Sequence, residues 1–101
     1  MFHNRRETVY YKLEYRDLWS AVGELTMNDY MVNYDDLNDD NKNNVKTIFK
    51  QMNEQINFDD INVIVSNGRT LKIIVNEGEL MYKFEWEYEK INYTKYYNDD
   101  S

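Results

Sequence analysis

The chain has 101 residues and a formal charge of −7, with 12 Lys and Arg against 19 Asp and Glu. This length suits one domain, and a 42% hydrophobic composition can fill its core. With no Cys and one His, His3, the sequence excludes disulfides, thiolate zinc sites, multi-histidine metal sites and most Ser-His chemistry. The acidic balance argues against direct binding to nucleic-acid phosphates, where affinity comes from Lys and Arg. We therefore predict a binding protein with no catalytic residues, no cofactor and no metal.

The sequence also predicts no membrane span and no secretory signal. Its longest apolar runs are only a few residues, and residues 1–7 lead into no smooth hydrophobic stretch. We expect a single cytoplasmic domain over residues 1–101.

The first expected elements are a strand and a short helix. Apolar and polar positions alternate over residues 8–15, which predicts a strand. Asp17 is the expected N-cap of the helix, and Gly23 weakens it. The apolar stripe of this helix is Leu18, Ala21, Val22 and Leu25.

A second helix is expected after Asn38, which is a good N-cap. Asp39 and Asp40 fall in its first turn, where the helix dipole favours anions. Its apolar residues recur at three- and four-residue spacing and would cover a sheet: Val45, Ile48, Phe49, Met52 and Ile56.

The C-terminal half predicts an antiparallel meander of strands over residues 61–65, 71–75 and about 80–92. Parity favours a three-residue loop ending in Gly68, because the loop pairs Val63 with Leu71 and Ile61 with Ile73.

An even loop around residues 76–79 then pairs Val75 with Leu80. The same register leaves Ile64, Ile74 and Met81 on the face opposite the helix. This small apolar patch is either ordinary surface or a seat for the short helix or a second copy of the chain.

The fold class we expect is α+β, with element order β-α-α-β-β-β. The sheet has three to four antiparallel strands, the C-terminal meander plus the N-terminal strand, with one or two helices on one face. The last strand is about twice as long as its partners, so its overhang from Trp86 onward needs a neighbour for its backbone groups. The N-terminal strand is the natural candidate.

Acidic residues before the second helix form the first candidate contact surface: Asp35, Asp36, Asp39 and Asp40. Part of a calcium loop is present, because Asp36, Asn38 and Asp40 match its first three ligand positions. Asn41 then replaces the required glycine, and the bidentate glutamate is missing. A capped loop, or a surface for a cationic partner, fits these residues better.

Glu85, Glu87 and Glu89 form a second candidate surface, because they share one face of the long strand about 6.5–7 Å apart. Such a row can imitate one strand of nucleic-acid phosphates. The alternative is a solvated sheet face whose glutamates meet Lys12 and Arg16 of the N-terminal strand.

Tyrosines beside Asn and Asp form a third candidate surface, since Tyr combines broad contact area with a polar tip. These candidates are Tyr30, Tyr34, Tyr93, Tyr96 and Tyr97. Three other tyrosines are expected on the inner face of the sheet: Tyr11, Tyr82 and Tyr88. Residues 94–101 are alternatively a frayed tail.

In length, charge and element content, this acidic, cysteine-free chain resembles the small inhibitors that phages encode against host systems, and above all the anti-CRISPR proteins of type II systems. The resemblance implies a larger bacterial host protein as partner, one with a Lys/Arg-rich nucleic-acid-binding groove, such as an RNA-guided nuclease. The chain would then inhibit this partner by occupying the groove, without binding nucleic acid itself.

The alternative function is a structural or regulatory interaction module. Such a module would be an immunity or antitoxin-like protein, or a homodimer that pairs through its sheet. An enzyme is the weakest reading, because the sequence offers no nucleophile–base pair.

Overall fold

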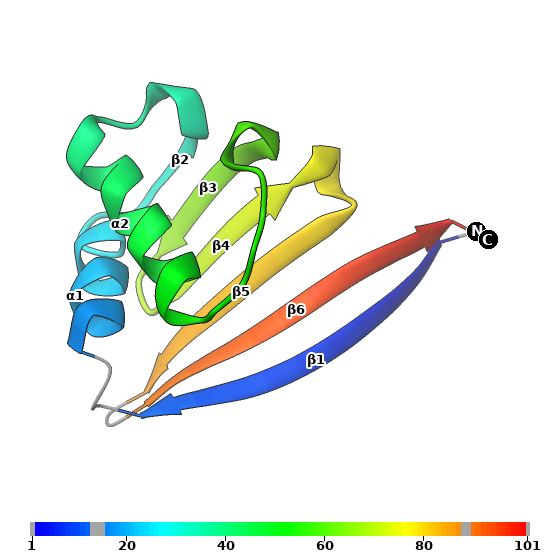
Figure 1. Ribbon diagram of the computed structural model, residues 1–101, viewed down its shortest axis with the longest axis horizontal. Helices are drawn as coiled ribbons and strands as arrows, with labels where there is room; N and C mark the ends of the chain where they lie inside the picture. The colour runs from blue at the N-terminus through cyan, green and yellow to red at the C-terminus, as the bar shows by residue number, and fades with distance from the viewer. Residues whose placement is uncertain (1, 13–15, 88–89, 101) are drawn as a thin grey trace.

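Both helices pack on one face of a six-stranded antiparallel sheet with strand order β1-β6-β5-β4-β3-β2 (Figure 1). The computed structural model describes residues 2–12, 16–87 and 90–100, and describes side chains over 18–86 and 90–97. The predicted α+β class with an antiparallel sheet is confirmed. Within these described residues, no helix combines the length and apolar character needed to cross a membrane.

The elements follow one another with short connections. In chain order they are β1 (Phe2–Lys12), α1 (Arg16–Leu25), β2 (Tyr30–Asn33), the 3-10 helix η1 (Tyr34–Asp36), α2 (Asp39–Gln51), η2 (Phe58–Asp60), β3 (Ile61–Asn67), β4 (Thr70–Val75), η3 (Asn76–Gly78), β5 (Leu80–Glu87) and β6 (Lys90–Asp100). The sequence prediction lacks β2 and merges β5 with the start of β6.

Helix α1 buries its predicted apolar stripe, Leu18, Ala21, Val22 and Leu25, each at most 2% exposed. It begins at Arg16, so Asp17 lies inside the helix instead of capping it. Gly23 weakens a helix in isolation, but here it makes room for Trp86, because a Cβ at this position would come within 2.8 Å of the Trp86 ring. A tertiary contact therefore explains the glycine.

Helix α2 has the predicted N-terminus and buries the predicted stripe except for Ile56, which lies beyond the end of the helix and is half-buried. The side chain of Asn38 accepts a hydrogen bond from the Asn41 backbone N–H at 2.8 Å, which makes it the N-cap. The buried residues of α2 and its C-cap are Val45, Ile48, Phe49 and Met52. They pack with the inner face of the sheet, whose buried residues on β4 and β5 are Leu71, Ile73, Val75, Tyr82 and Phe84.

The turn between β3 and β4 is shorter than predicted. Gly68 and Arg69 alone connect the two strands, and Gly68 has a φ of 61°, which suits a two-residue hairpin turn. The predicted pairing of Val63 with Leu71 is therefore wrong, and Leu71 lies opposite Ser66.

A β-bulge between Ile61 and Val63 preserves the apolar inner face of β3. Because the bulge changes the alternation, Ile61 and Ile64 are both buried although they stand three positions apart. The predicted pairing of Ile61 with Ile73 is also wrong, because the shorter turn shifts the register and Ile61 lies opposite Val75. Ile64 lies in the core instead of on the outer face.

The β4–β5 hairpin has the predicted register. Val75 lies opposite Leu80, and Ile74 lies opposite Met81 on the outer face. These pairs confirm the even loop that parity required.

The predicted long strand is in fact two antiparallel strands, β5 and β6. β6 begins at Lys90 and pairs with β5, with Trp86 opposite Ile91. Of the predicted overhang, Trp86 and Glu87 pair with β6, whereas residues 90–92 belong to β6 and pair with β1, the predicted neighbour. Glu89 lies outside the described residues.

Strand β1 is an edge strand that pairs with β6 along its whole length. Lys12 lies opposite Lys90, and Arg16 opens α1, so the predicted charge match with the glutamates of β5 is wrong. Residues 94–100 belong to β6 and form a paired strand instead of a frayed tail.

Helix α2 ends in a Schellman motif at Asn53, which has a φ of 58°. The Glu54 N–H donates to the Phe49 carbonyl at 3.0 Å, and the Asn53 N–H donates to the Lys50 carbonyl at 3.1 Å. This left-handed residue turns the chain sharply and places Glu54 next to the sheet.

Replacing Asn53 tests this motif. Asn53→Ala is expected to lower the free energy of unfolding by about 1 kcal/mol, because alanine disfavours the left-handed backbone. Asn53→Gly is expected to leave stability unchanged or slightly higher, because glycine adopts this conformation freely. Urea-induced unfolding measures both. Since both variants remove the same side chain, equal stabilities would contradict the role of the backbone.

Candidate protein-binding surface

Three short connections and the first turn of α2 gather at one end of the sheet (Figure 1). The connections are η1, η2 and η3, and each leaves or enters the sheet at the end where β3 begins and β4 ends. Together they carry exposed carboxylates, which define the acidic end: Asp35, Asp36, Asp39, Asp40, Asp59, Asp60, Glu77 and Glu79.

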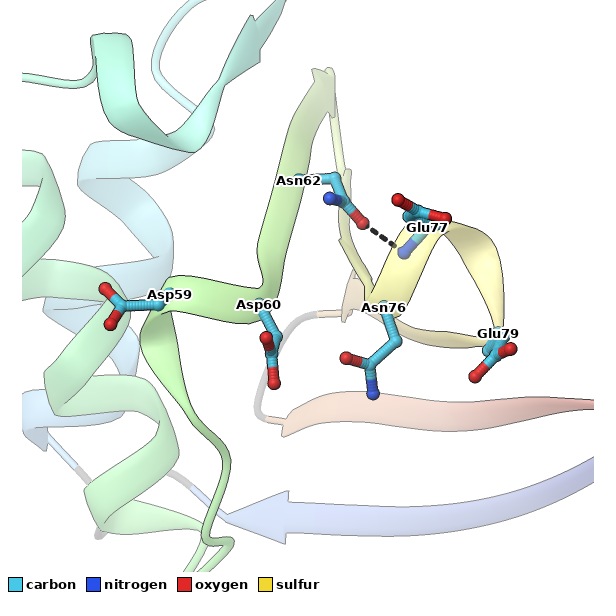
Figure 2. A pocket seen from close by; sticks show the side chains of 6 residues that line it. All are labelled: Asp59, Asp60, Asn62, Asn76, Glu77 and Glu79. Atoms are coloured by element: carbon cyan, nitrogen blue, oxygen red, sulfur yellow. Dashed lines mark hydrogen bonds between the residues drawn. The ribbon is translucent and has the colours of Figure 1, made fainter.

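A hollow of about 390 Å³ lies within the acidic end. Figure 2 shows Asp60 and Asn62, from η2 and β3, facing Asn76 and Glu77 of the β4–β5 connection, whereas the Asp59 side chain points away from them. Four carboxylates and two amides line it: Asp59, Asp60, Asn62, Asn76, Glu77 and Glu79. A lining of this kind attracts a positively charged group.

The wall formed by η3 depends on an unusual backbone. Asn76 and Glu77 have φ values of 54° and 56°, and Gly78 follows with 94°. The side-chain oxygen of Asn62 on β3 accepts a hydrogen bond from the Glu77 N–H at 2.5 Å. This bond joins β3 to the loop and holds the two sides of the hollow together.

No lysine or arginine among the described side chains forms an ion pair with the carboxylates of the acidic end. The nearby lysines lie over aromatic rings instead: Lys42 Nζ is 5.8 Å from the Tyr34 ring centroid, and Lys46 Nζ is 5.9 Å from that of Phe58. The negative field of this end is therefore only partly compensated within the chain.

The pKa of the Tyr34 phenol responds to this negative field. Burial raises its pKa, and the charges of Asp35 and Asp59 raise it further. Because Asp35 belongs to η1 and Asp59 to η2, one side chain senses carboxylates from two separate connections. Within the described part of the chain, no group of three or more acidic or histidine side chains has the arrangement of a metal site.

The structure brings the four predicted aspartates together with four carboxylates that sequence reasoning missed. Asp35, Asp36, Asp39 and Asp40 are all exposed at the acidic end. The missed residues are Asp59, Asp60, Glu77 and Glu79. They flank the predicted strands over 61–65, 71–75 and 80–92. The predicted antiparallel meander was therefore the feature that could have placed them at one end of the sheet.

The predicted glutamate row lies elsewhere. Glu85 is exposed on the outer face of β5, toward the end opposite η3, and its Oε1 is 3.3 Å from Lys83 Nζ. β5 ends at Glu87. Glu85 and Glu87 are therefore not part of the acidic end, and Glu89 is outside the described residues.

The predicted contact tyrosines differ in exposure. Tyr34 and Tyr93 are 6% and 4% exposed and belong to the core. Tyr30 is half-buried, its hydroxyl has no hydrogen-bond partner among the described residues, and burial raises its pKa. Tyr96 and Tyr97 are half-buried on β6. Among the tyrosines expected in the core, Tyr82 is buried, and the side chains of Tyr11 and Tyr88 are outside the described set.

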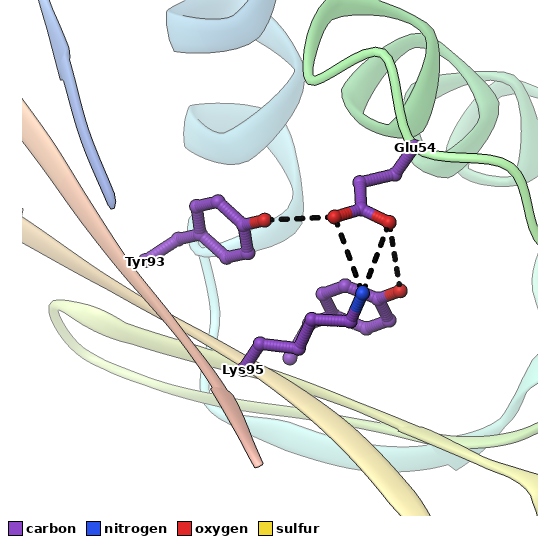
Figure 3. A network of polar contacts seen from close by, with 4 residues as sticks. Glu54, Tyr93 and Lys95 are labelled. Carbon is purple, nitrogen blue, oxygen red and sulfur yellow. Dashed lines mark hydrogen bonds and ion pairs between the residues drawn. The ribbon is translucent and has the colours of Figure 1, made fainter. Parts of the chain in front are cut away.

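A second polar group, the Glu54 cluster of Glu54, Tyr82, Tyr93 and Lys95, joins the end of α2 to the sheet (Figure 3). The Glu54 carboxylate accepts hydrogen bonds from Tyr93 Oη at 3.0 Å and Tyr82 Oη at 3.4 Å. Lys95 Nζ lies 3.2 and 3.3 Å from its two oxygens. Three donors from two strands thus converge on one carboxylate.

The charges of the Glu54 cluster stabilise one another. Burial raises the pKa of Tyr82 to about 12, and the neighbouring Glu54 charge contributes to this. Burial alone would lower the pKa of Lys95, but its hydrogen bonds with Tyr97 and Glu54 outweigh that effect and raise it. Because its polar groups already satisfy one another, the cluster is best suited to fastening α2 to the sheet.

Comparisons with protein-family models, curated proteins and solved structures each find no match to this chain.

Removing the Glu54 charge tests its role in stability. Glu54→Gln is expected to lower the free energy of unfolding by about 1–3 kcal/mol, because it weakens three charge-assisted contacts and leaves Lys95 without its carboxylate. The matched control Glu79→Gln, at an exposed carboxylate without an ion pair to any described side chain, is expected to change it by less than about 0.5 kcal/mol. Urea-induced unfolding at neutral pH compares the two variants, and equal losses would contradict the fastening role.

Proposed function

We propose that this chain is a non-catalytic binding protein that occupies a Lys/Arg-rich nucleic-acid-binding groove on a larger host protein, such as an RNA-guided nuclease, and thereby inhibits it. The observation that carries the proposal is the acidic end. Its exposed carboxylates come from four separate segments and have no cationic partners among the described side chains.

The physical basis is competition for positive charge. A groove that holds nucleic acid presents Lys and Arg side chains to a row of phosphates. A surface of unpaired carboxylates meets the same side chains and displaces the groove's own anions. Long-range attraction also speeds the encounter, since complementary fields raise association rates by about tenfold to a thousandfold.

The hollow adds a specific contact to this general attraction. Its carboxylates project from the two sides of a cavity that is large enough for the end of a long cationic side chain. An arginine guanidinium offers several donors in a fixed plane and can bridge carboxylates on both walls. We therefore expect an arginine of the partner to enter here.

The test is capture of partners from a bacterial lysate on the immobilised chain, followed by mass spectrometry. Capture of a nucleic-acid-handling protein is expected, and its association rate is expected to fall by about tenfold or more between 50 and 300 mM salt. Asp60→Asn/Glu77→Gln is expected to reduce capture strongly, because it removes two carboxylates from the hollow.

The charge-matched control is Glu24→Gln/Glu85→Gln, which removes two exposed carboxylates from α1 and the outer face of β5. It is expected to leave capture intact. Loss of capture in the control alone would move the contact to α1 or to the outer face of β5. Binding that is unchanged by salt and by the hollow variant would contradict the charge-based function.

A second candidate function, self-association, is favoured by the bare outer face of the sheet. Met31 on β2 is 76% exposed, and Ile74 lies opposite Met81 on the same face. If the chain is an interaction module that forms a homodimer through this face, sedimentation of the pure protein will depend on concentration, and Ile74→Lys will abolish the dimer. A monomer at all concentrations would contradict this candidate.

A further inference from the structure

The outer face of the sheet carries two lysines side by side near its centre. Lys72 on β4 and Lys83 on β5 are direct cross-strand partners. Both helices pack on the opposite face, so neither covers these side chains (Figure 1). Like charges directly opposite each other destabilise a sheet. In a chain with a net charge of −7, this pair is a local concentration of positive charge. An anion bound between the two lysines would reduce their repulsion.

The two lysines border a hollow of about 160 Å³, which we name the lysine hollow. Its other lining residues are Val65, Asn67 and Thr70. Because a water molecule occupies about 30 Å³ in the liquid, the space is large enough for a small oxyanion with one or two waters. The two ammonium groups, the Asn67 amide and the Thr70 hydroxyl supply donors on its rim.

The chain supplies only part of the counter-charge. Lys83 Nζ lies 3.3 Å from Glu85 Oε1, in an ion pair whose side chains are 27% and 48% exposed. No carboxylate among the described side chains lies within ion-pair distance of Lys72. Lys72 can therefore pair fully with an external anion, whereas the charge of Lys83 is partly neutralised by Glu85.

We infer that the lysine hollow binds a small oxyanion, a phosphoryl or carboxylate group, between Lys72 and Lys83. Each ammonium donates to one oxygen of the anion, and Thr70 and Asn67 add neutral donors. This site is independent of the acidic end, because it lies on the outer sheet face and selects the opposite charge.

The test titrates the protein with inorganic phosphate and, separately, with acetate at constant ionic strength, and follows backbone amide shifts by NMR. Saturable shifts are expected in the β3–β4 turn, β4 and β5. Lys72→Gln is expected to weaken binding about tenfold, the usual effect of losing one charge-assisted hydrogen bond. Glu85→Gln is expected to strengthen binding by up to about fivefold, because it frees Lys83 from a surface ion pair.

Lys50→Gln is the charge-matched control, since Lys50 is an exposed lysine on α2. It is expected to leave both titrations unchanged. Saturation by phosphate alone assigns a phosphoryl ligand, whereas saturation by acetate, alone or as well, assigns a carboxylate ligand. The inference is overturned if neither anion saturates, if Lys50→Gln weakens binding as much as Lys72→Gln, or if Glu85→Gln weakens it.

Discussion

Antiparallel pairing determines where this chain carries its charge. In an antiparallel sheet, successive connections alternate between the two ends, so the connections at one end come together although they are distant in the sequence. Here the connections after β2, before β3 and after β4 share one end, and each is acidic. The acidic end therefore follows from the strand directions and needs no long acidic segment in the sequence.

The β4–β5 register was predictable because both strands alternate without interruption, so a single parity argument fixes every pair. The same argument fails for β3, where a bulge between Ile61 and Val63 changes the side-chain alternation within the strand. The five residues Ile61–Val65 are all apolar except Asn62, so the sequence gives no sign of which ones face the core.

The division of this region into β5 and β6 escaped prediction for a different reason. Tyr88 and Glu89 are neither Gly, Pro, Asn nor Asp, and the alternation of large and polar residues continues to about Asn92. Local chemistry therefore favours one long strand. Only pairing with β1 and β5 together reveals that residues 90–100 form a separate central strand.

The candidate site shows the same division between local and long-range information. The aspartates before α2 are recognisable as a candidate site because they stand beside a helix cap. The other four carboxylates can be recognised only once the strand directions place them at the same end of the sheet: Asp59, Asp60, Glu77 and Glu79. The Glu54 cluster joins residues separated by 28 to 41 positions, and no local pattern marks Glu54 as the partner of Lys95.

Helix α2 connects these two polar regions while keeping their charges apart. Its 13 residues span about 20 Å, with Asp39 and Asp40 at one end and the Schellman motif that positions Glu54 at the other. This separation exceeds the screening length of about 8 Å at physiological ionic strength. The Glu54 cluster therefore contributes little to the field at Asp39 and Asp40. Its contribution to this surface is mechanical, because fastening the C-terminal end of α2 to β5 and β6 fixes the direction in which the helix presents its N-terminal aspartates.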